Sequence, residues 1–185
     1  MVKSKRRYEI NKGKKNYTVK RINPDEYGQD ILSVTKDAYR GWPEKYRPIL
    51  EDKEFIASLS LWNDAYVYGA FCKEDNSLCG YAMISDERDW LNFKILRSRP
   101  DHERNGINAA LVYGILCDQE EKLKKGLYIC DGARNISHET AFQEYLVKYF
   151  EFRKAYCKLN VMYAPKIKVA VKLLYPLRKI LSKLV

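Results

Sequence analysis

Alternating apolar and polar residues in the middle of the chain predict three consecutive strands. The runs 65–72 and 78–85 are joined by the polar turn 73–77, and residues 86–89 form a second turn into Leu91–Leu96. Side chains alternate between the two faces of a strand, so an alternating run presents one apolar face. Short polar turns between such runs favour antiparallel neighbours. The pattern therefore predicts an antiparallel meander.

A helix and a further strand follow the meander. Pro100 ends the third of these strands, because proline cannot donate to a strand ladder and keeps the preceding residue out of the helical conformation. The apolar stretch 109–117 predicts a helix that ends at Gly126, a residue type suited to the position after a helix. Residues 127–130 predict the next strand, so the chain makes a β-α-β step.

Three other segments have the spacing of amphipathic helices. Residues 23–26 combine an N-cap, a proline and two acids, which are typical of a helix start. A shorter helix is expected before residue 65, and residues 137–140 resemble the capped start of a third helix. Residues 158–163 predict a last strand. The expected buried positions of the three helices are Tyr27, Ile31, Val34, Ala38, Phe55, Ile56, Leu59, Trp62, Phe142, Tyr145, Leu146, Tyr149 and Phe150.

The N-terminal end of the chain is basic. Within the arm 1–16, Asn11–Lys14 predicts a turn between Tyr8–Ile10 and a first strand at Tyr17–Ile22, which together form a solvated hairpin. A nucleic-acid-binding tail is the alternative, although such tails are usually longer and lack a strand pattern.

The C-terminal segment 166–185 is also basic, and its pattern is ambiguous. Residues 166–172 alternate like a strand, whereas the leucines and isoleucine from residue 173 onward follow helical spacing. The segment either packs on the domain or on a partner subunit, or lies as a basic amphipathic helix on an anionic membrane. The basic residues that border its apolar stripe are Lys172, Arg178, Lys179 and Lys183.

Composition limits the class of protein. A chain of 185 residues with 46% hydrophobic residues suits one globular domain, and its formal net charge of +10 implies an anionic partner: nucleic acid, a phosphorylated cofactor or an anionic membrane. Five scattered cysteines without a Cys-x-x-Cys pair indicate reduced thiols in a cytoplasmic protein. Two histidines without ligand spacing predict no metal site. No apolar run reaches the ~18 residues of a membrane span.

The basic loop after the third meander strand is the most informative motif. A strand, a loop with one glycine and a helix start make a potential phosphate cradle, because free N–H groups and the positive end of the helix dipole meet there. The loop resembles the pyrophosphate motif of the GNAT superfamily of N-acyltransferases, Gln/Arg-x-x-Gly-x-Gly/Ala. Gly106 matches the first glycine, whereas Glu103 and Asn108 depart from the motif, and Arg104 supplies a neighbouring positive charge.

The resemblance implies a fold. A meander followed by a β-α-β step is the core order of GNAT proteins and covers almost the whole chain. The expected structure is a single α/β (α+β) domain over residues 1–165, with a mixed sheet of six to seven strands flanked by four helices. The segment 166–185 is expected to pack on this domain, on a partner or on a membrane surface.

The resemblance also implies acyl-CoA, most simply acetyl-CoA, as the co-substrate. A backbone N–H freed where the fourth and fifth strands separate, around residues 96–98, would stabilise an oxyanion. Arg97 and Arg99 are candidates for contact with the cofactor's outer phosphate. The expected cofactor-binding residues are Leu96, Arg97, Ser98, Arg104, Asn105, Gly106, Ile107, Asn108 and Ala109.

Candidate catalytic residues lie in and before the last helix. The stretch 146–154 resembles the family's Phe-Tyr-Glu-Lys-Leu-Gly-Phe ending, whose tyrosine often protonates the thiolate of coenzyme A. Val147 occupies that tyrosine position, whereas Tyr145 and Tyr149 lie two residues to either side, about 200° around the helix. Either tyrosine needs a register shift to serve as the acid. His138 is a candidate general base.

The acceptor side and the activity complete the prediction. Trp42 and Tyr46 are candidates for binding the acceptor or, equally, packing aromatics over the sheet edge. The predicted function is acyl transfer to an amine of a small molecule, a sugar or a peptide, in a cytoplasmic protein that forms a homodimer or contacts the inner face of a membrane. The alternatives are a Fem-like transferase that uses aminoacyl-tRNA and a non-catalytic protein with a vestigial acyl-CoA site. A specific nucleic-acid site is not expected.

Overall fold

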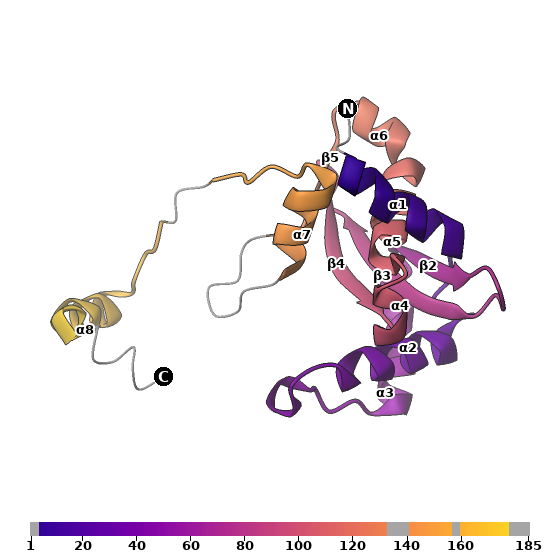
Figure 1. The fold of residues 1–185 in the computed structure, drawn as a ribbon. Helices are drawn as coiled ribbons and strands as arrows, with labels where there is room; N and C mark the ends of the chain where they lie inside the picture. The colour runs from indigo at the N-terminus through magenta and orange to yellow at the C-terminus, as the bar shows by residue number, and fades with distance from the viewer. Residues whose placement is uncertain (1–3, 133–140, 157–159, 178–185) are drawn as a thin grey trace. The chain divides into compact units, whose positions relative to one another are not determined.

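A computed structural model describes residues 4–132, 141–156 and 160–177. The chain divides into two compact units, Met1–Glu151 and Phe152–Val185. The first unit contains the sheet and α1 to α7, and the second contains α8 (Figure 1). The compact unit thus ends at residue 151, whereas the sequence pattern predicts a domain that extends to residue 165.

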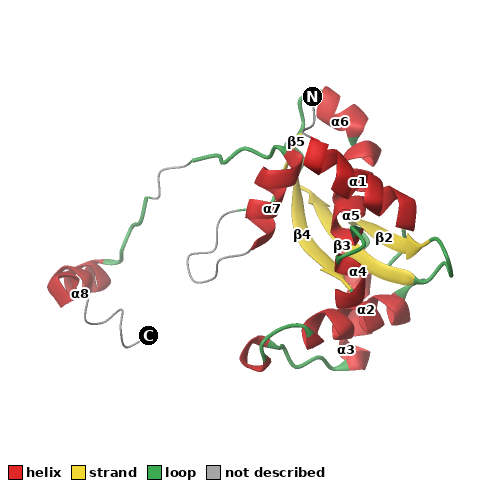
Figure 2. Cartoon of the chain, viewed as in Figure 1, coloured by secondary structure: helices red, strands yellow, loops and turns green. Residues whose placement is uncertain are grey.

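A five-stranded mixed sheet forms the centre of the first unit, as Figure 2 shows in yellow. The strands lie in chain order, with antiparallel neighbours from β1 to β4 and a parallel β4–β5 pair. This confirms the meander and the β-α-β step. The strands are β1 Tyr17–Arg21, β2 Ala65–Cys72, β3 Leu78–Asp86, β4 Trp90–Ser98 and β5 Tyr128–Cys130.

Helices cover both faces of this sheet. Successive strand residues point to opposite faces, and β3 shows this directly: Gly80 faces Ile107 of α5, whereas Tyr81 packs in a core cluster with Ile31 and Val34 of α2. The helices of the first unit are α1 Ser4–Asn16, α2 Gly28–Arg40, α3 Asp52–Ser58, α4 Pro100–Glu103, α5 Ile107–Asp118, α6 Glu120–Lys124 and α7 Ala141–Phe150, with 3₁₀ turns at Glu44–Tyr46 and Leu59–Trp62.

The far end of α5 is held to the sheet by a shared carboxylate. Asp118 accepts hydrogen bonds from the Tyr68 hydroxyl of β2 at 2.7 Å and from Arg21 Nε of β1 at 2.8 Å. At the other end of α5, its first residue, Ile107, is fully buried. Because both ends are anchored, the start of α5 has a defined position relative to the end of β4.

Helix α2, the first helix that the sequence pattern predicts, starts later than that pattern indicates. Asn23 does not cap a helix: its Oδ1 accepts the Asp25 N–H at 3.1 Å in a turn, and α2 begins at Gly28. The predicted buried face is confirmed, since Ile31 and Val34 are fully buried. The early acids therefore stabilise the turn before the helix rather than its first turn.

The N-terminal hairpin prediction is wrong. Residues 4–16 form α1, a continuous helix that contacts α5 and leads directly into β1. Gly13, which suggests a turn in the sequence, is a buried residue within this helix. A residue without a Cβ permits close contact between helices, and this contact explains the glycine better than a turn does.

The C-terminal segment is helical rather than extended. α8 spans Pro165–Leu174 and is followed by the 3₁₀ turn Tyr175–Leu177. Asn160–Tyr163 shows no strand, and the rest of the predicted last strand lies outside the described residues. In the described part of the chain, every helix falls short of the length and apolarity that a bilayer span requires.

We expect Gly13→Ala to lower the free energy of unfolding by about 1–3 kcal/mol, because the new Cβ would lie 2.5 Å from the Gly106 carbonyl oxygen. In a helix without this contact, the same change would instead stabilise by about 0.5–1 kcal/mol. Urea unfolding measures the difference, with Asn11→Ala as a control at an exposed position of α1. A Gly13→Ala protein more stable than the parent would disprove the packing of α1 on α5.

Candidate functional site

Strand β4 loses one of its two neighbours partway along. It pairs with β3 along almost its whole length but with β5 only over Trp90–Asn92. Just beyond, the register with β3 shifts, so that Lys94 is an extra residue between the paired positions of Phe93 and Ile95. Such a bulge bends a strand and interrupts its ladder. The two strands therefore separate from Phe93 onward, and residues 96–98 lie within the edge of β4 that β5 leaves unpaired.

The segment between β4 and α5 contains a short helical turn and a left-handed glycine. The Gly106 N–H donates to the Glu103 carbonyl at 3.1 Å, and Gly106 itself has φ +82° at the N-cap of α5. The Ala110 N–H donates to the Gly106 carbonyl at 2.9 Å, which is the first turn of the helix. The N–H groups of residues 107–109 have no acceptor within the helix, so this end favours an anion.

Helix α1 packs directly on this loop. A Cβ on Gly106 would lie 2.9 Å from the Gly13 nitrogen and 3.1 Å from the Glu9 carbonyl oxygen. The Asn16 side-chain amide donates to the Asn105 carbonyl at 3.1 Å. The space beside Gly106 is thus filled by the backbone of α1. This contact requires a glycine at position 106 whether or not a phosphate binds there, and it closes one side of the loop.

The side chains around the helix start divide into exposed polar and buried apolar groups. Arg104 and Asn105 are exposed, whereas Ile107 and Ala109 are buried and offer only their backbone. Asn108 Oδ1 is buried without a hydrogen-bond partner among the described residues. A phosphate accepts hydrogen bonds, so it suits Arg104 and the N–H groups at the start of α5, whereas the Asn108 oxygen suits a ligand N–H. The donors fit a diphosphate on the side where Arg104 is exposed.

Arg97 of β4 lies against aromatic rings at the end of α2. Its guanidinium carbon is 5.0 Å from the Trp42 ring centroid and 5.6 Å from that of Tyr39, which are cation–π distances. Its Nη1 also donates to the Leu96 carbonyl at 3.0 Å. Trp42 is 36% exposed and Tyr46 is 54% exposed. The structure thus joins Arg97, expected at the cofactor, with Trp42, expected at the acceptor.

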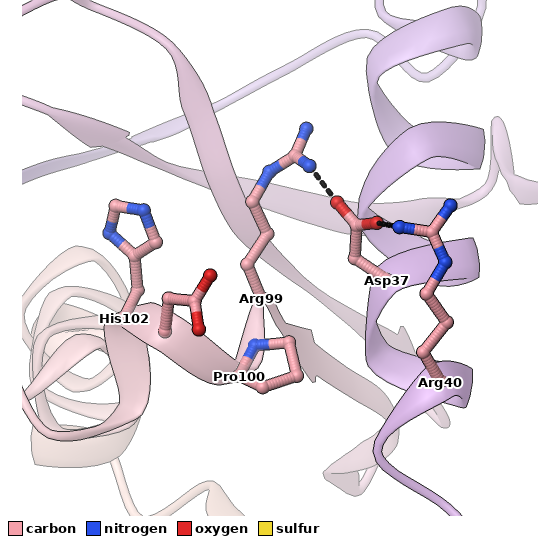
Figure 3. Close-up of a pocket in the computed structure, with 6 residues that line it drawn as sticks. Asp37, Arg40, Arg99, Pro100 and His102 are labelled. Atoms are coloured by element: carbon pink, nitrogen blue, oxygen red, sulfur yellow. Dashed lines mark hydrogen bonds and ion pairs between the residues drawn. The ribbon is translucent and has the colours of Figure 1, made fainter.

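A small open pocket of about 300 Å³ lies where α2 meets the start of α4 (Figure 3). Arg99 and Arg40 both point at the carboxylate of Asp37 and form ion pairs with it. Arg99 also donates to Ser33 Oγ at 3.0 Å and to the Leu78 carbonyl at 3.3 Å. These bonds hold the end of β4 to α2, so the guanidinium serves the fold. Contact of Arg99 with a cofactor phosphate remains a prediction. The lining residues are Asp37, Arg40, Arg99, Pro100, Asp101 and His102.

Helix α7 places aromatic side chains where β4 and β5 separate. The Phe142 ring packs edge-on against Phe93, with centroids 5.6 Å apart, and stacks on Tyr145 at 6.3 Å. Tyr149 lies one turn further on, 5.0 Å from Tyr145. Burial, and secondly the charge of Glu9 on α1, raise the pKa of Tyr145. The Tyr145 phenol therefore keeps its proton at neutral pH.

The end of α7 retains the backbone shape that the family ending implies. Glu151 stands at the expected glycine and has φ +61°, the left-handed conformation that glycine adopts without strain. Val147, at the expected tyrosine, is half-buried in the helix. His138 lies outside the described residues, and its role as a base stays a prediction.

Asp131 is a candidate that the sequence pattern does not single out. It directly follows β5, and its carbonyl accepts a hydrogen bond from Gln143 Nε2 of α7 at 3.4 Å. Burial raises the pKa of its carboxyl group to about 6. A carboxylate with this pKa is a suitable base near neutral pH. The sequence signal for Asp131 is only its place immediately after an apolar strand, and the burial of its carboxyl group cannot be inferred from that place.

Comparison with known proteins supports the fold. No protein-family profile and no curated protein sequence matches the chain. A ribosomal-protein-alanine N-acetyltransferase from Brucella melitensis biovar Abortus 2308 aligns with a TM-score of 0.58 and 14% identity, over 80% of this chain and 99% of that chain. AAC(6')-Iy, in complex with the bisubstrate analog CoA-S-monomethyl-acetylneamine, aligns with a TM-score of 0.54 and 12% identity, over 80% of this chain and 98% of that chain.

A third solved structure, a GNAT-family acetyltransferase from Streptococcus pneumoniae TIGR4, aligns with a TM-score of 0.50 and 15% identity over 80% of this chain and 98% of that chain. All three are similar to this chain over nearly their whole length. The chain therefore has the GNAT acyltransferase fold, as the strand order and the loop motif predict.

We expect the free energy of unfolding to fall as pH rises from about 4 to 6 through the contribution of Asp131. In this window the folded chain holds a proton on Asp131 that the unfolded chain has lost, because the pKa moves from 3.8 to about 6 on burial. Asp131→Asn removes this fall in urea unfolding at a series of pH values.

Asp75 serves as the control, because its contribution to the pH dependence of stability has the opposite sign to that of Asp131. Hydrogen bonds from Ser77 lower the pKa of exposed Asp75, so its contribution to stability is present above the unfolded pKa and is lost as pH falls. In the parent, the free energy of unfolding therefore decreases as pH falls, because Asp75 becomes protonated, and Asp75→Asn should remove this decrease. An Asp131→Asn protein with the parent's dependence between pH 4 and 6 would contradict the burial of Asp131.

Proposed function

We propose that this protein is an acyl-CoA-dependent N-acyltransferase, with acetyl-CoA as the donor to test first. The observation that carries the proposal is the arrangement of β4 and α5 within the GNAT fold. Among the residues that the structure describes, β4 has an edge without a β partner from Phe93, and the start of α5 presents backbone donors beside exposed Arg104. These two features supply what acyl transfer from a thioester requires: donors for a carbonyl oxygen and donors for a diphosphate.

Acyl-CoA, when bound, supplies an activated thioester carbonyl. Arg104 and the N–H groups of residues 107–109 hold its diphosphate from the side that α1 leaves open. Asn108 Oδ1, buried without a partner among the described residues, accepts a hydrogen bond from a ligand N–H. Binding thereby removes a buried unpaired acceptor, a group that costs about 1–3 kcal/mol when unsatisfied.

The reacting groups lie where β4 and β5 separate. A backbone N–H on the unpaired edge of β4 donates to the carbonyl oxygen as it gains negative charge, a contribution of about 3 kcal/mol in comparable sites. The Asp131 carboxylate, mostly ionised at pH 7 with a pKa of about 6, takes the proton that the amine loses. Tyr145 donates a hydrogen bond to the departing thiolate, since its raised pKa makes it a poor proton donor.

The acceptor is an amine of a small molecule, an amino sugar or a peptide. Its expected position is the Trp42 side of β4, where Arg97 and Tyr39 line an exposed aromatic and cationic surface with Tyr46 nearby. Amine acceptors are supported by the neighbours: an aminoglycoside acetyltransferase in complex with sisomicin aligns with a TM-score of 0.52 at 12% identity. A flat aromatic ring suits the apolar face of a sugar as well as a peptide side chain.

Two observations favour a second function, a non-catalytic protein with a vestigial acyl-CoA site. The backbone of α1 occupies the space beside Gly106, and Val147 replaces the expected tyrosine. In that case the glycine serves helix packing alone. Binding of acyl-CoA decides between the two functions.

We expect acetyl-CoA to bind with micromolar affinity in calorimetric titration and Arg104→Ala to weaken this binding at least tenfold, about 1.4 kcal/mol, because it removes a charged donor to the diphosphate. Lys53→Ala, which removes an exposed cation from α3, is the matched control and should leave the affinity unchanged. Absence of heat and of any thermal shift with all acyl-CoAs would refute the proposal. Aminoacyl-tRNA would then be the next donor to test.

Trp42→Ala should raise the KM for an amine acceptor identified by screening about tenfold and leave the affinity for acetyl-CoA unchanged. The substitution removes the ring that Arg97 contacts and that the acceptor is expected to cover. Steady-state kinetics with Leu61→Ala, an exposed apolar residue before β2, provide the control. A loss of acetyl-CoA affinity with an unchanged KM for the amine would place Trp42 at the cofactor instead.

A further inference from the structure

The net positive charge of this protein comes almost entirely from its C-terminal unit, residues 152–185. Of its 34 lysines and arginines, nine lie in residues 152–185, whereas none of its 24 acidic residues does. Residues 1–151 therefore carry 25 basic and 24 acidic residues, a formal net charge of only +1 of the total +10. The excess of positive charge that implies an anionic partner therefore comes mainly from residues 152–185.

The described part of the C-terminal unit is also rich in exposed apolar side chains. α8 has no buried residue, and the 3₁₀ turn that follows it has none either. Met162 is 96% exposed and Leu173 is 72% exposed. Soluble surfaces rarely collect such residues without a partner. Among the described residues of this unit, the exposed apolar side chains include Tyr156, Val161, Met162, Tyr163, Ile167, Val169, Leu173, Leu174 and Leu177.

α8 separates its lysines from much of its apolar surface. Lys168 and Lys172 are four residues apart and share one side of the helix. Ile167, Val171 and Leu174 lie together on another side, at successive positions of three and four residues. A helix of this kind can lie in an interface that is anionic on one side and apolar on the other.

Among three partners outside the chain, charge and chemistry together favour one. A second copy of this unit is disfavoured because nine positive charges would face nine others. A nucleic acid would satisfy the lysines but leave the aliphatic side chains against water. An anionic bilayer surface satisfies both, since its phosphates pair with the lysines and its acyl boundary takes up the aliphatic groups.

We propose that the segment 160–177 binds the surface of bilayers that contain anionic phospholipids, with α8 lying in the plane of the interface. This binding is independent of the acyltransferase proposal, because it uses no residue of the first unit. It would hold the first unit close to a membrane surface.

Vesicle sedimentation of the full-length protein tests the proposal. We expect binding to phosphatidylcholine vesicles that contain phosphatidylglycerol, no binding to phosphatidylcholine alone, and weaker binding as salt is raised. The triple variant Lys166→Gln/Lys168→Gln/Lys172→Gln should reduce the affinity at least tenfold. Leu173→Ser/Leu174→Ser should reduce it similarly at unchanged charge.

A matched triple variant in the first unit distinguishes an effect of the charges on α8 from an effect of the protein's overall net charge. Lys20→Gln/Lys53→Gln/Lys125→Gln removes the same charge from exposed positions and should bind vesicles like the parent. Equal weakening by the two triple variants, or equal binding to neutral vesicles, would overturn the proposal. So would displacement of the protein from anionic vesicles by mixed-sequence RNA, or a dimer that Leu173→Ser/Leu174→Ser abolishes without changing vesicle binding. Circular dichroism confirms that each variant is folded.

Discussion

The organisation of the site depends on the short pairing between β4 and β5. β5 meets β4 over only three residues, and a bulge at Lys94 bends β4 just where this pairing ends. A strand edge in the interior must find other partners for its N–H and C=O groups, or a ligand. Helix α7 covers part of this region through Phe142 and Phe93. The opening between the strands follows from the length of β5, not from any single catalytic residue.

The contact between α1 and α5 constrains the other half of the site. α1 is a polar and strongly basic helix, with little apolar surface to hold it in place. Its position instead rests on the approach of two backbones at Gly13 and Gly106 and on the hydrogen bond from Asn16 to Asn105. The same glycine that resembles a phosphate-binding residue is therefore also a helix-packing residue. The packing contact with α1 by itself requires a glycine at position 106, and a phosphate bound at this loop would add a second demand for a residue without a Cβ.

Charge is distributed between the two units in a way that separates their roles. The first unit is almost neutral overall, and its arginines are largely engaged: Arg99 with Asp37, Arg21 with Asp118 and Arg97 with aromatic rings. The second unit contributes a formal charge of +9. A diphosphate at the start of α5 would thus be recognised by local donors, whereas the long-range field of the protein comes mainly from residues 152–185.

The sequence by itself determined the elements whose signals are local. The alternation around Leu91 and the apolar stretch 109–117 predict the strand, the helix and their order, which the structure confirms, although the helix predicted to end at Gly126 is divided at Gln119 into α5 and α6. The absence of acids after Glu151 is likewise a property of the sequence alone. These signals depend on residues within a few positions of one another, so no tertiary information is needed to read them.

Only the tertiary structure decided what depends on residues far apart in the chain. Gly13 suggests a turn until α5 is placed beside it, and Asp131 is an ordinary aspartate until burial at the end of β5 raises its pKa to about 6. The loss of the β5 partner at Phe93 depends on the length of a strand more than 30 residues later. Packing, desolvation and strand pairing are set by whichever groups come together in space, and the local pattern of a sequence does not contain that information.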